Sequence, residues 1–156
     1  LDEIDQKRFF IRERNKTVSK GDEGEILIIM TSNSEKNLPD AFLRRCAFFH
    51  IEFPKGERLR EIIKRNLGAD HPYTGAAYDG LIKMFTEIRE GAERKKPATA
   101  ELIGWLRILS MKDYLNQSGA QKKELLKHNL SFLIKTESDL KIAQRWLAGK
   151  DASDLP

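Results

Sequence analysis

Hydrophobic residues follow two different patterns along this chain, and the pattern changes near Pro54. Before Pro54, short apolar runs alternate with polar stretches. Residues 26–30 are five consecutive apolar residues, which is typical of a strand buried on both faces of a parallel sheet. Two more strands are predicted at residues 8–12 and 47–53. Pro39 and the residues up to position 45 predict a short helix between the last two of these strands.

After Pro54, apolar residues recur at spacings of three and four, which is the period of an amphipathic helix. The spacing predicts five helices, around residues 59–67, 78–88, 102–109, 125–130 and 140–147. Gly68 is expected to end the first helix and Thr99 to cap the third. The stretch from Thr136 to Asp139 resembles a capping box that opens the fifth. The predicted architecture is therefore an α/β part over residues 1–54 and an all-helical part over residues 55–156.

Composition narrows the class of protein. The chain has 156 residues, of which 40% are hydrophobic and 33% charged, enough for one domain or two small ones. The net charge of +4 is too small to indicate nucleic-acid binding by itself. Cys46 is the single cysteine, which excludes an internal disulfide and a cysteine-rich zinc site. No membrane-spanning run or secretory signal is visible, so a cytoplasmic location is expected. The chain starts at Leu1 and not at Met, in the middle of a sequence pattern, which suggests a piece of a longer protein.

Signals of a self-contained enzyme are missing from the sequence. No stretch has the spacing G-x-x-x-x-G-K-[ST] that cradles phosphates. The three histidines are scattered, so no metal site is predicted. One polar cluster remains, Thr31-Ser32-Asn33, directly after the apolar run 26–30. Because ligands bind at the carboxyl ends of strands in open α/β sheets, this cluster is a candidate site.

Three stretches of the chain stand out together: IIMTSNSEKNLPDAFLRRCAFFHIEFP, KKPATAELIGWL and LIKTESDLKIAQRWL. They resemble the AAA+ ATPases, and in particular their MoxR-type (dynein-related) branch. The resemblance implies that residues 1–54 are the C-terminal part of the AAA+ α/β core. That part would hold a hairpin at about residues 9–25, the sensor-1 strand, the arginine-finger helix and the last strand. Residues 55–156 would be the helical lid.

The same resemblance implies roles for individual residues. Asn33 takes the sensor-1 position, where an amide orients a water near the γ-phosphate of ATP, and Thr31 assists it. Arg45 is expected to be the arginine finger of a neighbouring subunit's site, because its Arg-Cys pair is similar to the finger motif of clamp loaders. Arg44 is the alternative finger, or it forms a local ion pair.

The lid departs from the family pattern at one position. Ala100 stands where related sequences often carry the sensor-2 arginine, and an alanine cannot contact a phosphate. Lys95 and Lys96 are the nearest cations, and Lys96 is the candidate for a nucleotide contact. A weakened or absent sensor 2 is the favoured interpretation.

Residues 1–5, Leu-Asp-Glu-Ile-Asp, have two interpretations. They resemble the end of a Walker B strand, in which Asp2 would hold Mg²⁺ and Glu3 would activate water. In the family that the chain resembles, a helix lies between Walker B and the hairpin, and residues 5–8 are too few to form it. The resemblance therefore favours the end of that helix, running into the hairpin, for residues 1–5.

The resemblance implies that the whole protein hydrolyses ATP, with Mg²⁺, at the subunit interfaces of a ring, usually a hexamer. It also implies chaperone-like remodelling or maturation of protein clients, often with a von Willebrand factor A-domain partner. Neither nucleotide nor Mg²⁺ is expected to bind tightly to this chain alone, and neither a membrane nor a nucleic acid is an expected partner. The alternative function is a non-enzymatic helical module that binds a protein or a nucleic acid through the basic face at residues 58–65. A clamp-loader-like ATPase is a third possibility, against which the lid sequence argues.

Overall fold

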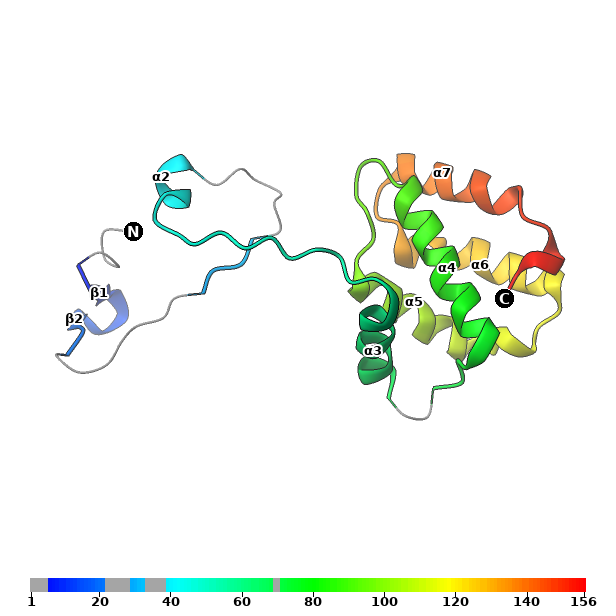
Figure 1. The fold of residues 1–156 in the computed structure, drawn as a ribbon, viewed down its shortest axis with the longest axis horizontal. Helices are drawn as coiled ribbons and strands as arrows, with labels where there is room; N and C mark the ends of the chain where they lie inside the picture. The colour runs from blue at the N-terminus through cyan, green and yellow to red at the C-terminus, as the bar shows by residue number, and fades with distance from the viewer. Residues whose placement is uncertain (1–5, 22–28, 33–38, 69–70) are drawn as a thin grey trace. The chain divides into compact units, whose positions relative to one another are not determined.

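A computed structural model describes residues 6–21, 29–32, 39–68 and 71–156 of the chain. The chain divides into two compact units, residues 1–51 and 52–156 (Figure 1). The sequence pattern had placed this boundary after Pro54. Each unit is described by itself below.

The first unit contains a β-hairpin. Strand β1 (Arg8–Ile11) pairs antiparallel with β2 (Lys16–Ser19), with Phe9 opposite Val18. A short 3₁₀ turn, η1 (Arg12–Arg14), connects them and ends at Asn15, whose φ of 46° is left-handed. Asparagine tolerates this conformation better than most residues, so it suits the turn. The predicted strand at residues 8–12 and the predicted hairpin are thus present.

A short helix, α2 (Asp40–Leu43), follows Pro39 and confirms the helix that was predicted there. The prediction of a strand at residues 47–53 is wrong for this structure, because these residues belong to no strand. Ile29 and Met30 are also in no strand, while residues 26–28 of that predicted strand lie outside the described residues. A strand needs a neighbour to complete its hydrogen bonds. In the described part of the chain, β1 and β2 pair only with each other.

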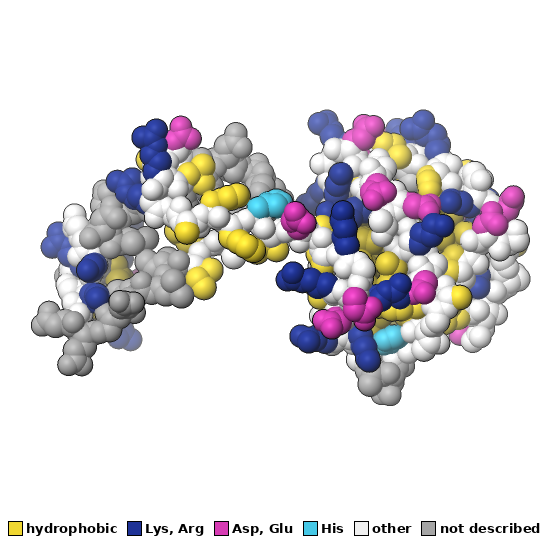
Figure 2. All heavy atoms as spheres, viewed as in Figure 1, with side chains coloured by type: hydrophobic (Ala, Val, Ile, Leu, Met, Phe, Trp, Pro, Cys, Tyr) yellow, Lys and Arg dark blue, Asp and Glu magenta, His cyan; other side chains and the backbone are white. Residues whose placement is uncertain are grey.

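The apolar residues of these two runs are correspondingly exposed. Phe48 and Phe49 expose 76% and 83% of their surface, and Ile29 exposes 79%. Figure 2 shows apolar side chains at the surface of this unit. The described residues therefore give a hairpin and a helical part, without the parallel sheet that the sequence predicted.

The second unit is helical, and all five predicted helices are confirmed within its described residues. They are α3 (Gly56–Leu67), α4 (Gly75–Gly91), α5 (Thr99–Met111), α6 (Gly119–Leu133) and α7 (Glu137–Ala148), with short 3₁₀ turns η2 (Tyr114–Asn116) and η3 (Ala152–Asp154). Helix α5 packs against α3 and α6, and α7 packs against α4 and α6 (Figure 1).

The core of this unit is one cluster of buried apolar side chains that draws on all five helices. Its largest fully buried members are Trp105, Tyr73, Tyr114, Phe85, Ile63, Leu81, Leu102, Leu106, Leu109, Leu126, Leu130 and Leu133. Burial of these side chains is what stabilises the unit, because isolated helices of this length are marginal in water.

Helix ends follow the sequence signals with one exception. Gly68, with φ of 90°, ends α3, and its N–H donates to the carbonyl of Lys64. Thr136 caps α7 by accepting a hydrogen bond from the N–H of Asp139 at 3.3 Å. The prediction that Thr99 caps α5 is wrong, because the cap is Ala98 and Thr99 is already helical. The Glu101 carboxylate accepts the N–H of Ala98 at 3.0 Å, so this helix end is satisfied without a hydroxyl.

Candidate functional site

Two adjacent arginines follow the short helix α2. The N–H of Arg44 donates to the carbonyl of Asp40 at 3.0 Å, which continues the helical turn, and both arginine side chains are exposed. Arg45 Nη1 donates to the carbonyl of Ala41 at 2.9 Å, one turn back along the chain. This bond holds the guanidinium against α2 while the group keeps its fixed positive charge. The structure thus places both predicted arginines together at a helix end.

The other predicted site residues of the first unit are only partly described. Thr31 is exposed and lies in no helix or strand. Asn33 lies outside the described residues, as do Asp2 and Glu3. The predicted sensor-1 role of Asn33 therefore stays a prediction.

The loop between α4 and α5 is held by a buried carboxylate of α7. The carboxylate of Asp139 accepts hydrogen bonds from the N–H groups of Glu93, Arg94 and Lys95 at 2.9, 3.1 and 2.9 Å. The hydroxyl of Thr136 donates to it as well, at 2.8 Å. Consecutive N–H groups that converge in this way form a cradle for an anion. Here the anion is a side chain of the protein itself, with only 1% of its surface exposed.

These hydrogen bonds also set the charge state of Asp139. The N–H of Lys95 contributes most, with the Thr136 hydroxyl and two further N–H groups, and together they lower the pKa of this carboxyl from 3.8 to about 2. Burial opposes the shift but is outweighed. The carboxylate is therefore ionised, and the loop is fixed, at any pH near neutrality.

The far end of the same loop is fixed by Arg89. Its guanidinium donates to the carbonyl of Pro97 and lies 3.7 Å from the ring centre of Phe53. Partial burial lowers the pKa of Arg89. Lys96 is exposed between the two anchored ends of the loop, and Ala100 is exposed in the first turn of α5. The structure thus presents Lys96 from an ordered loop of the second unit.

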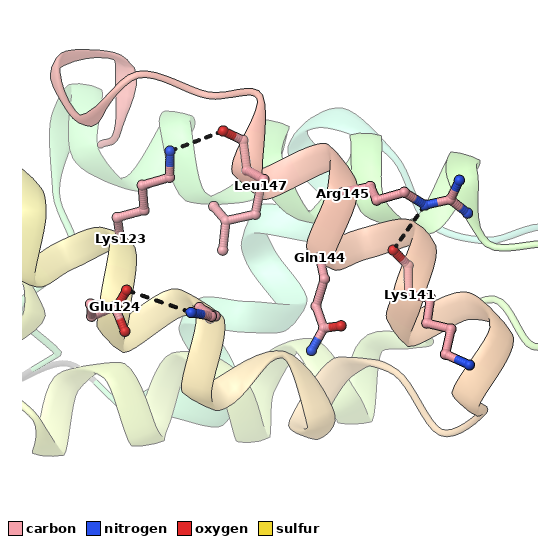
Figure 3. A pocket seen from close by; sticks show the side chains of 8 residues that line it. Lys123, Glu124, Lys141, Gln144, Arg145 and Leu147 are labelled. Atoms are coloured by element: carbon pink, nitrogen blue, oxygen red, sulfur yellow. Dashed lines mark hydrogen bonds and ion pairs between the residues drawn. The ribbon is translucent and has the colours of Figure 1, made fainter.

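A groove of about 680 Å³ lies between α6 and α7 (Figure 3). It is lined by Lys123, Glu124, Lys127, Lys141, Gln144, Arg145, Leu147 and Ala148. Lys123 donates to the carbonyls of Ala148 and Lys150, at 3.1 and 2.5 Å, and so satisfies groups left open at the end of α7. Four of the eight lining residues are cationic and one is anionic, which makes this a basic groove.

Two of these features were missed from the sequence. Asp139 was interpreted only as part of a helix cap, and no local signal reveals that its main partners lie more than forty residues earlier in the chain. The basic groove, in contrast, has a signal in the sequence. Its cations are spaced four apart in each helix, at 123 and 127 and at 141 and 145, which places each pair on one helix face.

The described residues contain neither a metal-ligand cluster nor a membrane-spanning helix. Their histidine, cysteine, aspartate and glutamate side chains form no group of three or more that could hold a metal ion. None of their helices combines the length and apolar character that a membrane crossing requires.

Comparison with known proteins gave no relative for this chain. No family model matches it, and no curated protein or solved structure matches it significantly.

Proposed function

We propose that this chain is part of a MoxR-type AAA+ ATPase and supplies the arginine finger, the sensor-1 residue and the helical lid. The observation that carries the proposal is the Arg44-Arg45 pair, which is exposed directly after a short helix. The pair lies in the first of the three stretches that resemble AAA+ ATPases, residues 28–54. The hairpin before it and the five-helix unit after it give the order of elements that the motif implies.

The chemistry of the arginines fits a phosphate contact. A guanidinium carries a permanent charge and a planar fork that matches phosphate oxygens. The sequence has no phosphate-cradling loop, so ATP and Mg²⁺ would be held by other parts of the ring and not by this chain alone. Arg45 would exchange its bond to the Ala41 carbonyl for a phosphate oxygen of the adjacent subunit. There it would stabilise charge that develops during hydrolysis.

Further residues have supporting roles in this proposal. Asn33 would orient the attacking water, with Thr31 beside it. Sensor 2 would be weak or absent, because Ala100 stands in place of the arginine, and Lys96 in its anchored loop is the candidate for a nucleotide contact. The complete protein would form a hexameric ring that remodels or matures protein clients, with a von Willebrand factor A-domain protein as a partner.

The decisive variant is Arg45→Ala in the complete protein, with Arg44→Ala as the matched control one residue away. We expect Arg45→Ala to bind a fluorescent ATP analogue as the wild type does but to hydrolyse ATP on the order of a thousandfold more slowly. Arg44→Ala should have the smaller effect. Hydrolysis by Arg45→Ala at the wild-type rate would refute the finger assignment.

A mixing experiment tests whether the arginine acts across a subunit interface. Arg45→Ala subunits keep an intact nucleotide site, whereas subunits with a disrupted P-loop keep an intact finger. Each preparation alone should be inactive, and mixed rings should recover part of the activity. Failure of the mixture, with mixed rings shown to form, would argue that Arg45 does not act in trans.

The basic groove between α6 and α7 favours a second candidate, a protein-binding module, which is compatible with the first. The basic face at residues 58–65 is a weaker basis for such a module. Arg60 of that face is already paired with Asp79 and lies against the ring of Tyr78.

A further inference from the structure

The groove between α6 and α7 combines a hollow with an excess of positive charge. Lys123 and Lys127 line it from α6, and Lys141 and Arg145 line it from α7 (Figure 3). Glu124 is the one carboxylate among its eight lining residues. The lining therefore has a net charge of +3, whereas Figure 2 shows cationic and anionic side chains interspersed over the face of this unit that it presents.

Two of the four cations donate to backbone carbonyls of α7 or of the residues that follow it. Lys123 is held by the carbonyls of Ala148 and Lys150. Arg145 Nε donates to the carbonyl of Lys141 at 3.4 Å, which holds the guanidinium along its helix. These two charges are ordered before any ligand arrives, which lowers the entropic cost of binding.

The other two cations have partners that they can exchange. Lys141 pairs with Glu137 at 2.6 Å and Lys127 with Glu124 at 3.8 Å, and all four side chains are more than half exposed. Exposed pairs of this kind contribute little to stability, so a carboxylate from another molecule can replace the internal one at little cost.

The spacing of the cations indicates the form of the ligand. Residues four apart in a helix are separated by about 6 Å along its axis, so each side of the groove presents two charges at that interval. An acidic helix with carboxylates four residues apart has the same interval. Ala148 is the exposed apolar residue of the lining, whereas Leu147 is almost fully buried, so Ala148 is the residue that an aliphatic side chain of the ligand would contact. None of the eight lining residues is aromatic, and aromatic side chains are what single-stranded nucleic acids use for stacking.

We propose that the α6–α7 groove binds an acidic, amphipathic helix of a partner protein. Carboxylates of that helix would contact Lys127, Lys141 and Arg145, and an aliphatic side chain would contact Ala148. This inference does not rest on the ATPase proposal, because it concerns only the second unit and is tested without nucleotide.

The test uses the 156-residue chain and a fluorescein-labelled helical peptide of four Glu-Ala-Ala-Leu repeats, followed by fluorescence anisotropy. The repeat places glutamates and leucines each four residues apart. A peptide of Gln-Ala-Ala-Leu repeats has the same apolar face without the charge. We expect the Glu peptide to bind at least about tenfold more tightly than the Gln peptide, since tenfold is about 1.4 kcal/mol.

The groove is tested by the double variant Lys127→Glu with Lys141→Glu. Its control is Lys64→Glu with Lys83→Glu, which makes the same change in net charge at exposed lysines of α3 and α4. Lys123 is left intact because it caps α7. We expect affinity for the Glu peptide to fall by about tenfold or more in the groove variant and by less than about threefold in the control. Circular dichroism melts verify folding, and Lys127→Gln with Lys141→Gln replaces the groove variant if it is unfolded.

Three results would overturn the proposal. They are equal losses in the groove and control variants, equal binding of the Glu and Gln peptides, and no binding of the Glu peptide at millimolar concentration. Competition with a 16-nucleotide oligo(dT) tests whether the groove binds a nucleic acid instead. If it displaces the Glu peptide more effectively than unlabelled Glu peptide does, the groove is a nucleic-acid site and the assignment to an acidic helix is wrong.

Discussion

Truncation of Leu106 tests whether the five helices of the second unit share one cooperative core. Leu106 lies in α5, the helix that packs against both α3 and α6, and its side chain is fully buried. Leu106→Ala removes three buried methyl or methine groups, and at about 0.8 kcal/mol each this costs about 2.4 kcal/mol in transfer free energy. The cavity left among rigid helices adds to this, so we expect a loss of about 3–4 kcal/mol in the free energy of unfolding.

The measurement is urea unfolding of the 156-residue chain, followed by circular dichroism and tryptophan fluorescence. Both tryptophans, Trp105 and Trp146, are in the second unit, so the fluorescence reports on that unit. Met111→Ala is the matched control, because Met111 is in the same helix but exposes 83% of its surface. It should change the free energy by less than about 0.5 kcal/mol.

Two outcomes would refute this reasoning. If Leu106→Ala costs less than about 1 kcal/mol, or no more than Met111→Ala, the side chain is not packed as the structure shows. If fluorescence and circular dichroism give different midpoints, the helices do not unfold as one unit.

Two further predictions concern the hydrogen bonds from the N–H groups of residues 93–95 to Asp139, here called the Asp139 clamp, and the close approach of Gly119 to Ala152. The pKa of Asp139 is lowered to about 2 in the folded chain, so its stabilising effect is complete above pH 4 and is lost as the pH falls towards 2. Calorimetry should show a lower Tm for Asp139→Asn than for the wild type at pH 7. Between pH 4 and 2 the Tm of the variant should fall less than the Tm of the wild type. If the two plots of Tm against pH run parallel, the clamp is contradicted. Gly119→Ala should destabilise by on the order of 1 kcal/mol, because the new Cβ would lie 2.7 Å from the carbonyl oxygen of Ala152. Gly104→Ala, with no neighbouring atom within 4 Å, should instead stabilise α5 by about 0.5–1 kcal/mol, and urea unfolding distinguishes the two signs.

The helices could be predicted because the information that defines them is local. Each helix makes its backbone hydrogen bonds within itself, and its apolar stripe is visible as a spacing of three and four residues. The caps at Gly68 and Thr136 were predicted for the same reason. At Thr99 the prediction was wrong by one residue, because Glu101 reaches back to the N–H of Ala98 and satisfies that helix end.

The strands after the hairpin could not be predicted in this way. An apolar run such as residues 47–53 shows that a segment has surface to bury, but the partner that completes its hydrogen bonds lies elsewhere in the sequence or in another chain. The hairpin is the exception, because β1 and β2 are separated by only four residues and supply each other's partners. Phe48 and Phe49 are strongly exposed for the corresponding reason, since the described residues provide nothing that covers them.

In the candidate site, too, the features with a local sequence signal could be predicted and those that depend on distant residues could not. The residues around Arg44 and Arg45 predicted a short helix with the two arginines at its end, and in the structure the helix ends at Leu43, directly before them. The Asp139 clamp joins α7 to a loop that precedes it by more than forty residues, so no spacing in the sequence predicts it. The basic groove is intermediate, because each helix shows its own pair of cations but only the packing of α6 against α7 brings the two pairs together.

Helix α7 connects the clamp and the groove, and this determines how their variants must be interpreted. At 100° per residue, Lys141 and Arg145 lie about 200° and 240° around the helix from Asp139, so the buried carboxylate and the groove cations are on opposite sides. A substitution at Lys141 therefore leaves the bonds from Asp139 to the loop in place, whereas Asp139→Asn acts on the loop without changing the charge of the groove. Amide NMR shifts of Glu93, Arg94 and Lys95 separate the two effects. If charge reversal at Lys127 and Lys141 alters peptide binding while these shifts stay constant, the loss of affinity comes from the groove and not from movement of α7.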